Sequence, residues 1–204
     1  MKNILLIIVF ALFAFNPAFI FSQKKDIRKK QNKPTEVVRR IEIVAEPQVE
    51  NKVWKELISE EGNFKILFPK EPEKLIRDKD FSRGNSFIEY KLWTNFRKYS
   101  VSFGDLGAVK SLSDNQLKEI YDKMRDGIIK DAKGNLINDN NINVGNVFGR
   151  EIIYEQENYL VTNRYFFYGS KLYQIITAVE KKLSSEKNVQ KFGNKFLDSF
   201  DFVR

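Results

Sequence analysis

The chain has 204 residues, a formal net charge of +8, no cysteine and no histidine. It therefore cannot form a disulfide, a thiolate or imidazole metal site, a Ser-His-Asp triad or a cysteine nucleophile. Only carboxylates, lysine, tyrosine and hydroxyl groups remain for catalysis, so the composition favours a protein that is not an enzyme and that needs no metal or other cofactor.

Residues 1–22 have the pattern of a secretory signal peptide. A short basic start precedes an apolar run from Ile4 to Phe15, and Ser22 supplies a small residue before a polar stretch. We expect cleavage between Ser22 and Gln23, which gives a periplasmic or extracellular protein with no transmembrane span. The alternative is an uncleaved anchor, but Asn16 and Pro17 interrupt the apolar stretch before it reaches the about 20 residues that a span needs.

The positive charge is concentrated just after this segment. Six basic residues and one acidic residue, Asp26, lie between Gln23 and Lys33, and the six are Lys24, Lys25, Arg28, Lys29, Lys30 and Lys33. From Trp54 to Arg204 there are 25 basic and 22 acidic residues, mixed as on an ordinary solvated surface, so nucleic acid is not an expected partner. The six residues, called the basic arm, are predicted to act as an electrostatic tether to anionic lipid or to an acidic partner. The alternative is a solvated spacer.

Residues 23–52 are expected to form a linker that precedes a single globular domain at 53–204. Within the linker, Val37, Arg39, Ile41 and Ile43 alternate with Val38, Arg40 and Glu42, and Pro47 ends the run. This alternation is typical of a strand, so a docking strand near 36–45 is one interpretation and a continuous flexible linker is the other.

The first part of the domain is predicted to contain two pairs of strands. The turn residues Glu61-Gly62-Asn63 separate two apolar runs, and Pro69 ends the second run. Residues 86–93 and 97–106 form the second predicted pair. The charged stretch 73–85 is expected to be an exposed loop.

A helix is predicted to begin after Ser113, because Ser113 and Gln116 have the spacing of a capping box. Its apolar residues recur at helical spacing and are Leu117, Ile120, Tyr121, Met124 and Ile128. Lys133-Gly134-Asn135 is expected to end the helix. The Asn-rich stretch 135–146 is predicted to be a polar loop, and it lacks the carboxylates that a calcium loop requires.

Three further strands are predicted at 150–157, 159–168 and 171–179, with Gly169-Ser170 as a type II′ turn. Both the odd- and the even-numbered positions of these strands are apolar, so the sheet should be covered on both faces. A second helix within 184–200, capped by Ser184 or Ser185, can supply part of this cover. Its apolar residues are Val189, Phe192, Phe196, Leu197 and Phe200.

Four short stretches together resemble the PsbP-like fold. They are FKILFPKEPE at 64–73, GREIIYE at 149–155, YFFYGSKLYQI at 165–175 and KFLDSFDF at 195–202. The family includes the extrinsic photosystem II protein, secreted bacterial relatives and a nuclear-transport protein that binds the Ran GTPase. The resemblance implies an α+β fold, in which an antiparallel sheet is flanked by helices in an α-β-α sandwich, and a non-enzymatic docking or assembly role. Family roles that depend on histidine cannot be carried over to a chain without histidine.

The leading hypothesis is a secreted, non-catalytic binding or assembly module of the bacterial cell envelope, expected to be a monomer, whose partner is an envelope protein or the membrane surface. The alternative is a carrier that holds a small apolar or aromatic ligand between the sheet and the second helix. Its candidate ligand-facing residues are Phe166, Tyr168, Tyr173 and Phe192. A third hypothesis, an enzyme that uses Glu151, Glu155 and Glu157, is disfavoured because alternating acids on a strand usually face solvent.

Overall fold

The computed structural model describes residues 53–77, 87–94, 96–106, 112–185 and 187–203. The expected signal peptide, the basic arm and the expected docking strand lie outside these residues. The elements in chain order are β1 (Lys55–Ser59), β2 (Phe64–Phe68), β3 (Glu73–Arg77), β4 (Phe87–Trp93), β5 (Arg97–Asp105), α3 (Asp114–Ala132), β6 (Asn135–Val144), β7 (Val147–Gln156), β8 (Tyr159–Tyr168), β9 (Lys171–Glu180), the 3-10 turn η3 (Lys181–Leu183), α4 (Lys187–Asp198) and β10 (Asp201–Phe202). None of the helices in the described ranges has both the length and the apolar character to cross a bilayer.

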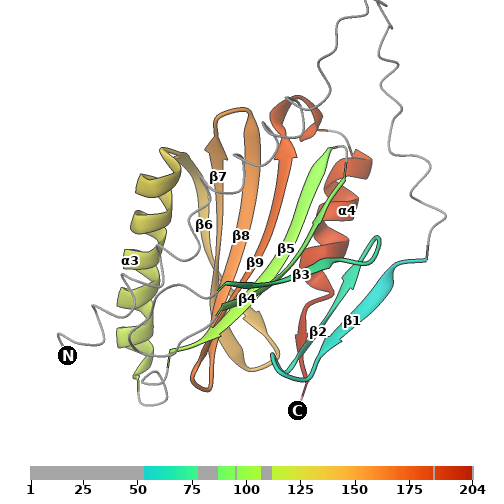
Figure 1. Cartoon of the computed structure of the whole chain (residues 1–204). Coiled ribbons are helices and arrows are strands. Elements are labelled where there is room, and N and C mark those ends of the chain that lie inside the picture. The colour runs from blue at the N-terminus through green and yellow to red at the C-terminus, as the bar shows by residue number, and fades with distance from the viewer. Residues whose placement is uncertain (1–52, 78–86, 95, 107–111, 186, 204) are drawn as a thin grey trace, which may run out of the picture.

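The strands form two antiparallel sheets. Seven strands pair in the order β3-β4-β5-β9-β8-β7-β6, and β1, β2 and β10 form a small sheet with β2 in its centre. Helix α3 covers one face of the large sheet, whereas α4 and the small sheet lie against the opposite face (Figure 1). The predicted α+β class, with an antiparallel sheet between helices, is confirmed.

Two-residue turns set the register of the central strands. Tyr168 pairs with Lys171 across the β8–β9 turn, and Gly169 has a φ of +62°, a value that glycine adopts without strain. The three predicted strands are confirmed as β7, β8 and β9. Each of these turns pairs an odd-numbered residue of one strand with an even-numbered residue of the next. Each face of the sheet therefore carries odd-numbered residues from one strand and even-numbered residues from its neighbour.

Helix α3 begins and ends where its sequence predicts. The Ser113 hydroxyl accepts from the Gln116 backbone N–H, and the Gln116 side chain accepts from the Ser113 backbone N–H at 2.9 Å, so the capping box is confirmed. Lys133, in a left-handed conformation with φ 48°, ends the helix, and its N–H and that of Gly134 satisfy carbonyls of the last turn.

Two predicted loops are strands instead. The polar stretch from Asn135 is β6, which pairs with β7 along its length, and Glu73–Arg77 is β3, which pairs with β4. Both lie at the edges of the large sheet. Polar and charged side chains are compatible with an edge strand, because one side of that strand meets water while its neighbour satisfies the backbone. The loop predictions were wrong because they relied on composition; residues 78–85 lie outside the described residues.

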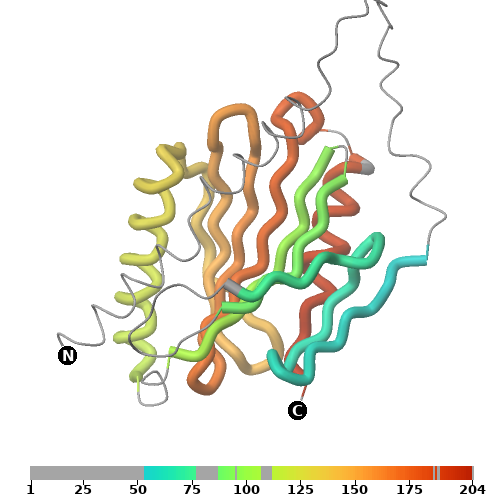
Figure 2. The backbone as a smooth tube through the Cα atoms, in the orientation of Figure 1, coloured from blue at the N-terminus to red at the C-terminus, as the bar shows by residue number. Residues whose placement is uncertain are grey.

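The large sheet separates two apolar cores. This agrees with the prediction that the sheet is covered on both faces, which was made because its odd- and even-numbered positions are both apolar. On the α3 side, Tyr121 and Met124 pack on strand residues such as Phe167 and Ile152. The chain path in Figure 2 shows α4 on the opposite side of the sheet from α3. The predicted apolar residues of the second helix are buried there, and they are Val189, Phe192, Phe196, Leu197 and Phe200.

The predicted cap of the second helix, Ser184 or Ser185, stays a prediction. Helix α4 is described from Lys187, and residue 186 before it lies outside the described residues. The Ser184 hydroxyl donates to the Lys181 carbonyl at 2.7 Å, within the turn that connects β9 to α4.

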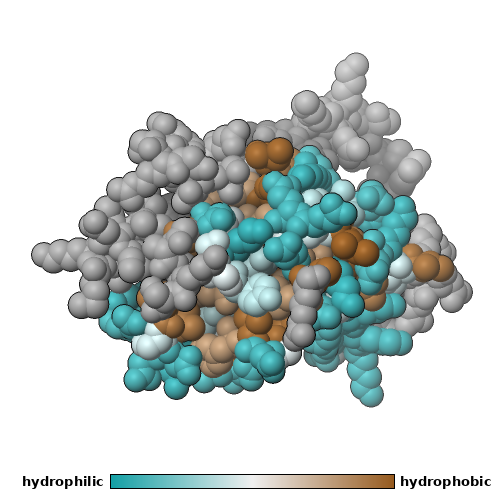
Figure 3. All heavy atoms as spheres, turned by 90° about the horizontal axis from the view of Figure 1, so that it is seen from below, coloured by the Kyte–Doolittle hydropathy of each residue, from teal (hydrophilic) through white to brown (hydrophobic). Residues whose placement is uncertain are grey.

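The C-terminal strand closes one end of the sandwich. Val203 donates its N–H to the Asn63 carbonyl at 2.9 Å, which joins the C-terminal segment to the β1–β2 turn. Figure 3 shows this end of the molecule, where apolar areas lie among hydrophilic side chains. Tyr168 and Val203 are each 38% exposed, so they contribute apolar surface at this end of the molecule.

Candidate functional site

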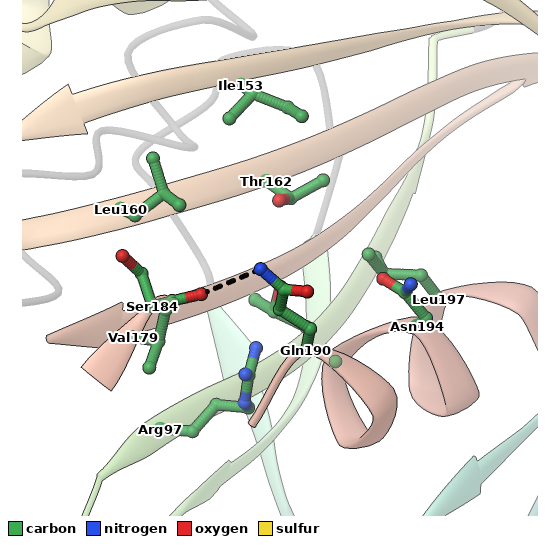
Figure 4. A pocket seen from close by; sticks show the side chains of 11 residues that line it. Arg97, Ile153, Leu160, Thr162, Val179, Ser184, Gln190, Asn194 and Leu197 are labelled. Carbon is green, nitrogen blue, oxygen red and sulfur yellow. Dashed lines mark hydrogen bonds between the residues drawn. The ribbon is translucent and has the colours of Figure 1, made fainter. Parts of the chain in front are cut away.

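A pocket of about 200 Å³ lies between α4 and the β7–β9 part of the large sheet (Figure 4). It is partly open to solvent. Its lining residues are Arg97, Ile153, Leu160, Thr162, Thr177, Val179, Ser184, Gln190, Gly193, Asn194 and Leu197. Because the pocket has contributions from β5, β7, β8, β9 and α4, no local stretch of sequence encodes it.

The strand register forms the floor of the pocket. Ile153, Thr162 and Thr177 lie directly opposite one another on β7, β8 and β9. In the next row, Leu160 pairs with Val179. Side chains that are opposite each other on adjacent strands lie on the same face, so the floor combines aliphatic surface with two threonine side chains.

Arg97 and Gly193 form one wall. Arg97 pairs with Val179 across β5 and β9, is 5% exposed, and donates from its guanidinium to the Val189 carbonyl in the first turn of α4. A Cβ atom at Gly193 would lie 2.5 Å from Nη1 of Arg97. Glycine at this position therefore lets the guanidinium approach the helix closely.

Two amide side chains stand at the mouth. Gln190 and Asn194 are exposed on α4, four residues and thus about one turn apart. Gln190 donates from Nε2 to the Ser184 carbonyl at 3.0 Å (Figure 4). An amide side chain carries both donors and an acceptor, so the mouth can bind polar groups of either kind.

The lining is suited to binding and contains no acid or base for catalysis. It holds one arginine, hydroxyl groups, amides and aliphatic side chains, and no carboxylate, lysine or tyrosine. The nearby acids of β7 are held in ion pairs: Glu151 lies 2.6 Å from Arg164, and Glu155 lies 2.5 Å from Lys181. Throughout the described ranges, no three acidic side chains come together to hold a metal ion.

Two of the four predicted ligand-facing aromatic residues lie in the second core. Phe166 stacks on Phe200 with ring centroids 5.8 Å apart, and both Phe166 and Tyr173 are fully buried. The Tyr173 hydroxyl donates to the Gly62 carbonyl at 2.8 Å, which fixes the β1–β2 turn to the large sheet. In the structure, Tyr173 thus holds the β1–β2 hairpin of the small sheet in place.

The other two lie apart from each other. Tyr168 is at the β8–β9 turn, where its ring centroid is 4.6 Å from that of Phe202. Phe192 is on α4 and stacks on Trp54 at 6.2 Å. None of the four lines the pocket, and a role in ligand binding stays a prediction. The basic arm lies outside the described residues.

Sequence reasoning did not select Arg97, Thr162, Thr177, Gln190 or Asn194. The threonines give no distinct signal, since β8 also contains Asn163 and Arg164 and β9 also contains Gln174. Their juxtaposition depends on strand register and on where α4 returns to the sheet.

A separate charged cluster links α3 to β6 and β7. Asp139 accepts from Arg125 and from Arg150, each at 2.7 Å, and Arg150 also reaches Asp122 at 2.9 Å. Partial burial opposes ionisation of Asp139, but the hydrogen bonds from Arg150 and Arg125 outweigh it and lower the pKa of the carboxyl below its ordinary value. The cluster therefore fastens the edge strand β6 to the helix.

This cluster predicts a pH dependence. A carboxyl whose pKa is lowered in the folded state contributes stability above its unfolded pKa, about 3.9 for Asp, and loses that contribution as pH falls through the folded pKa. We expect the free energy of unfolding to decrease below about pH 4, and Asp139→Asn to reduce that decrease. Urea unfolding at several pH values measures both. Glu71→Gln at an exposed pair is the control, and an Asp139→Asn slope equal to that of the unsubstituted chain would contradict the assignment.

Comparison with solved structures identifies the architecture. The solution structure of cyanobacterial PsbP (CyanoP) from Synechocystis sp. PCC 6803 matches with a TM-score of 0.54 and 11% sequence identity, over 83% of this chain and 99% of CyanoP. The chain has a PsbP-like fold. A Pseudomonas aeruginosa protein of unknown function matches at a TM-score of 0.40 and 11% identity, over 70% of this chain and 94% of that protein, which is too distant to support an argument. No protein-family model and no curated protein matches the sequence.

The resemblance read from the four short stretches is thereby confirmed at the level of fold. At 11% identity the match to CyanoP concerns architecture alone, and function must be argued from the site.

Proposed function

We propose that this chain is a non-catalytic binding or assembly module exported to the bacterial cell envelope. The observation that carries the proposal is the pocket lining, which offers hydrogen-bonding and apolar groups without an acid or base. The absence of cysteine and histidine from the whole sequence supports the same conclusion. The signal-like N-terminus supports export with cleavage after Ser22, and the PsbP-like fold is compatible with a docking role.

The proposed division of the mature chain is a linker at 23–52 and one domain at 53–204. Trp54 supports this boundary, because it packs edge-on to Tyr99 and stacks on Phe192, so the packed region already includes the residue before β1. The basic arm then lies about 20 residues before the domain, which is far enough along the chain to reach a separate surface.

The tether role of the basic arm predicts salt-dependent binding to anionic membranes. Each basic residue near such a surface contributes about 1 kcal/mol. Replacing Lys24, Lys25 and Lys29 by Gln should therefore lower the partition coefficient of residues 23–204 by on the order of a hundredfold at low salt. Sedimentation with vesicles containing phosphatidylglycerol measures this effect, with phosphatidylcholine vesicles as the uncharged comparison.

A matched variant distinguishes the effect of the basic arm from the effect of the protein's total charge. Lys118, Lys130 and Lys133 are exposed on or next to α3, and replacing them by Gln removes the same charge from the domain. We expect little change for this variant. Equal losses for the two variants would show that total charge and not the arm governs binding, and no binding by the unsubstituted chain would leave an envelope protein as the partner to seek.

A carrier of a small ligand is the second candidate, favoured by the position of the pocket between the sheet and α4. Its volume of about 200 Å³ lies below the 300–1,000 Å³ that is usual for ligand sites. A carrier should gain thermal stability with a lipid or metabolite from a panel, whereas a binding module should respond only to its partner surface.

A further inference from the structure

The pocket beside α4 has the dimensions and lining of a receptor for one aliphatic side chain. Its volume of about 200 Å³ is small for a drug-sized ligand, and Leu160, Val179 and Leu197 provide apolar contact. We propose that this pocket is occupied by the chain's own segment 36–45, with Ile41 entering it. Anchor residues in small, well-lined pockets commonly dominate the affinity of a polypeptide contact.

The mouth of the pocket fits the backbone of an extended segment. Gln190 and Asn194 are four residues apart on α4, a rise of about 6 Å along the helix. Residues two apart in an extended chain are about 6.7 Å apart, so both amides can bond successive backbone groups on the same side of the segment. The alternation from Val37 to Ile43 supplies that extended pattern, with aliphatic side chains recurring at every second or fourth residue.

The chain before the domain starts close enough to reach the pocket. Trp54 stacks on Phe192, and Nζ of Lys195 lies 4.7 Å from the Trp54 ring centroid. At 100° per residue, this side of α4 is opposite the side that carries Gln190 and Asn194. The ten residues from Val44 to Val53 span at most about 33 Å, which is ample to cross a helix of about 10–12 Å diameter.

The charges of α4 are complementary to those of the segment that would cross it between Trp54 and the pocket. The exposed part of α4 that lies between Trp54 and the pocket carries Lys187 and Lys191, and both side chains are on the solvent side of the helix. The crossing segment carries Glu46 and Glu50. Opposite charges along the path favour this segment as the occupant over an unrelated apolar peptide.

Docking in this way would place the basic arm beside α4 and orient the domain on a charged surface. The inference requires neither export nor membrane binding. A failed docking test therefore leaves the proposed function in place, and failed vesicle binding leaves the docking test unaffected.

The absence of cysteine from the chain permits a direct test in the full protein. Glu42→Cys with Asn194→Cys places one thiol beside the expected anchor and the other at the mouth of the pocket, and Gln190 and the aliphatic lining remain to bind the segment. Under mild oxidation we expect an intramolecular disulfide to form about tenfold faster than in Glu42→Cys with Lys118→Cys, because docking raises the effective concentration of the first pair. Lys118 is exposed on α3, across the sheet. Mass spectrometry of the digested protein identifies the linked peptides.

A third variant tests the anchor itself. Adding Ile41→Lys to the Glu42→Cys, Asn194→Cys pair should reduce its cross-linking rate to that of the Lys118 pair, since a second cation is disfavoured beside the Arg97 guanidinium that lines the pocket. The substitution lies outside the domain, so circular dichroism should be unchanged. Equal rates for the two cysteine pairs, cross-linking that is insensitive to Ile41→Lys, or disulfides only between two copies of the chain would each overturn the proposal.

Discussion

Replacing Lys98 by methionine should lower the free energy of unfolding by about 3–5 kcal/mol, among the largest effects of any single substitution in this chain. The Lys98 ammonium lies 3.3 Å from a carboxylate oxygen of Glu89, and the two side chains are 2% and 9% exposed. The Ser100 hydroxyl donates to the same oxygen at 2.6 Å. Removing the lysine takes a positive charge away from a carboxylate that water barely reaches, and that carboxylate then loses much of its compensation.

Urea unfolding of three variants tests this assignment. Glu89→Leu combined with Lys98→Met removes both charges, and it should recover most of the stability lost in Lys98→Met alone. Lys55→Met breaks an exposed pair with Glu71 and should change the free energy of unfolding by no more than about 1 kcal/mol. If Lys98→Met behaves like Lys55→Met, the buried pair contributes little.

The second large effect is expected at Phe64, where alanine should lower the free energy of unfolding by about 3–5 kcal/mol. Phe64 is fully buried on β2 and meets aromatic rings of the large sheet and of the C-terminal segment. Its ring centroid is 5.7 Å from that of Phe103 and 5.5 Å from that of Phe200. Truncation therefore opens a cavity at the contact between the two sheets.

The near-UV circular dichroism of the Phe64→Ala variant should change as well, because the packing of neighbouring tyrosines depends on this ring. Phe64→Leu keeps most of the apolar volume and should be less destabilising than Phe64→Ala. Ile58→Ala, at a side chain that is 57% exposed on β1, is the matched control in the small sheet and should have a small effect. A loss at Phe64 no larger than that at Ile58 would show that the small sheet is not integral to the core.

Local interactions explain the elements that sequence patterns predicted correctly. The Ser113–Gln116 capping box acts within four residues, and the apolar spacing from Leu117 to Ile128 needs only the helical repeat. The Gly169-Ser170 turn likewise depends on the conformational freedom of one glycine. These signals do not depend on the rest of the chain, so a single sequence is enough to detect them.

The two wrong loop predictions concern edge strands. The composition of Asn135–Val144 is typical of a loop, yet its backbone pairs with β7 and Asp139 is held by Arg125 and Arg150. Pairing with a neighbour outweighs weak strand propensity, as it also does for Glu73–Arg77 against β4. Composition alone cannot report such a neighbour.

The sequence by itself determined which chemistries are excluded, where the charge lies, which segments form helices and hairpins, and that the sheet must be covered on both faces. These properties follow from residue types and from spacing along the chain. Only the tertiary structure decided that Arg97, Thr162 and Asn194 share a pocket, and that Phe166 and Tyr173 pack within the second core. Strand register and the position of α4 bring these residues together from distant parts of the sequence, and both are set by the packing of the whole domain.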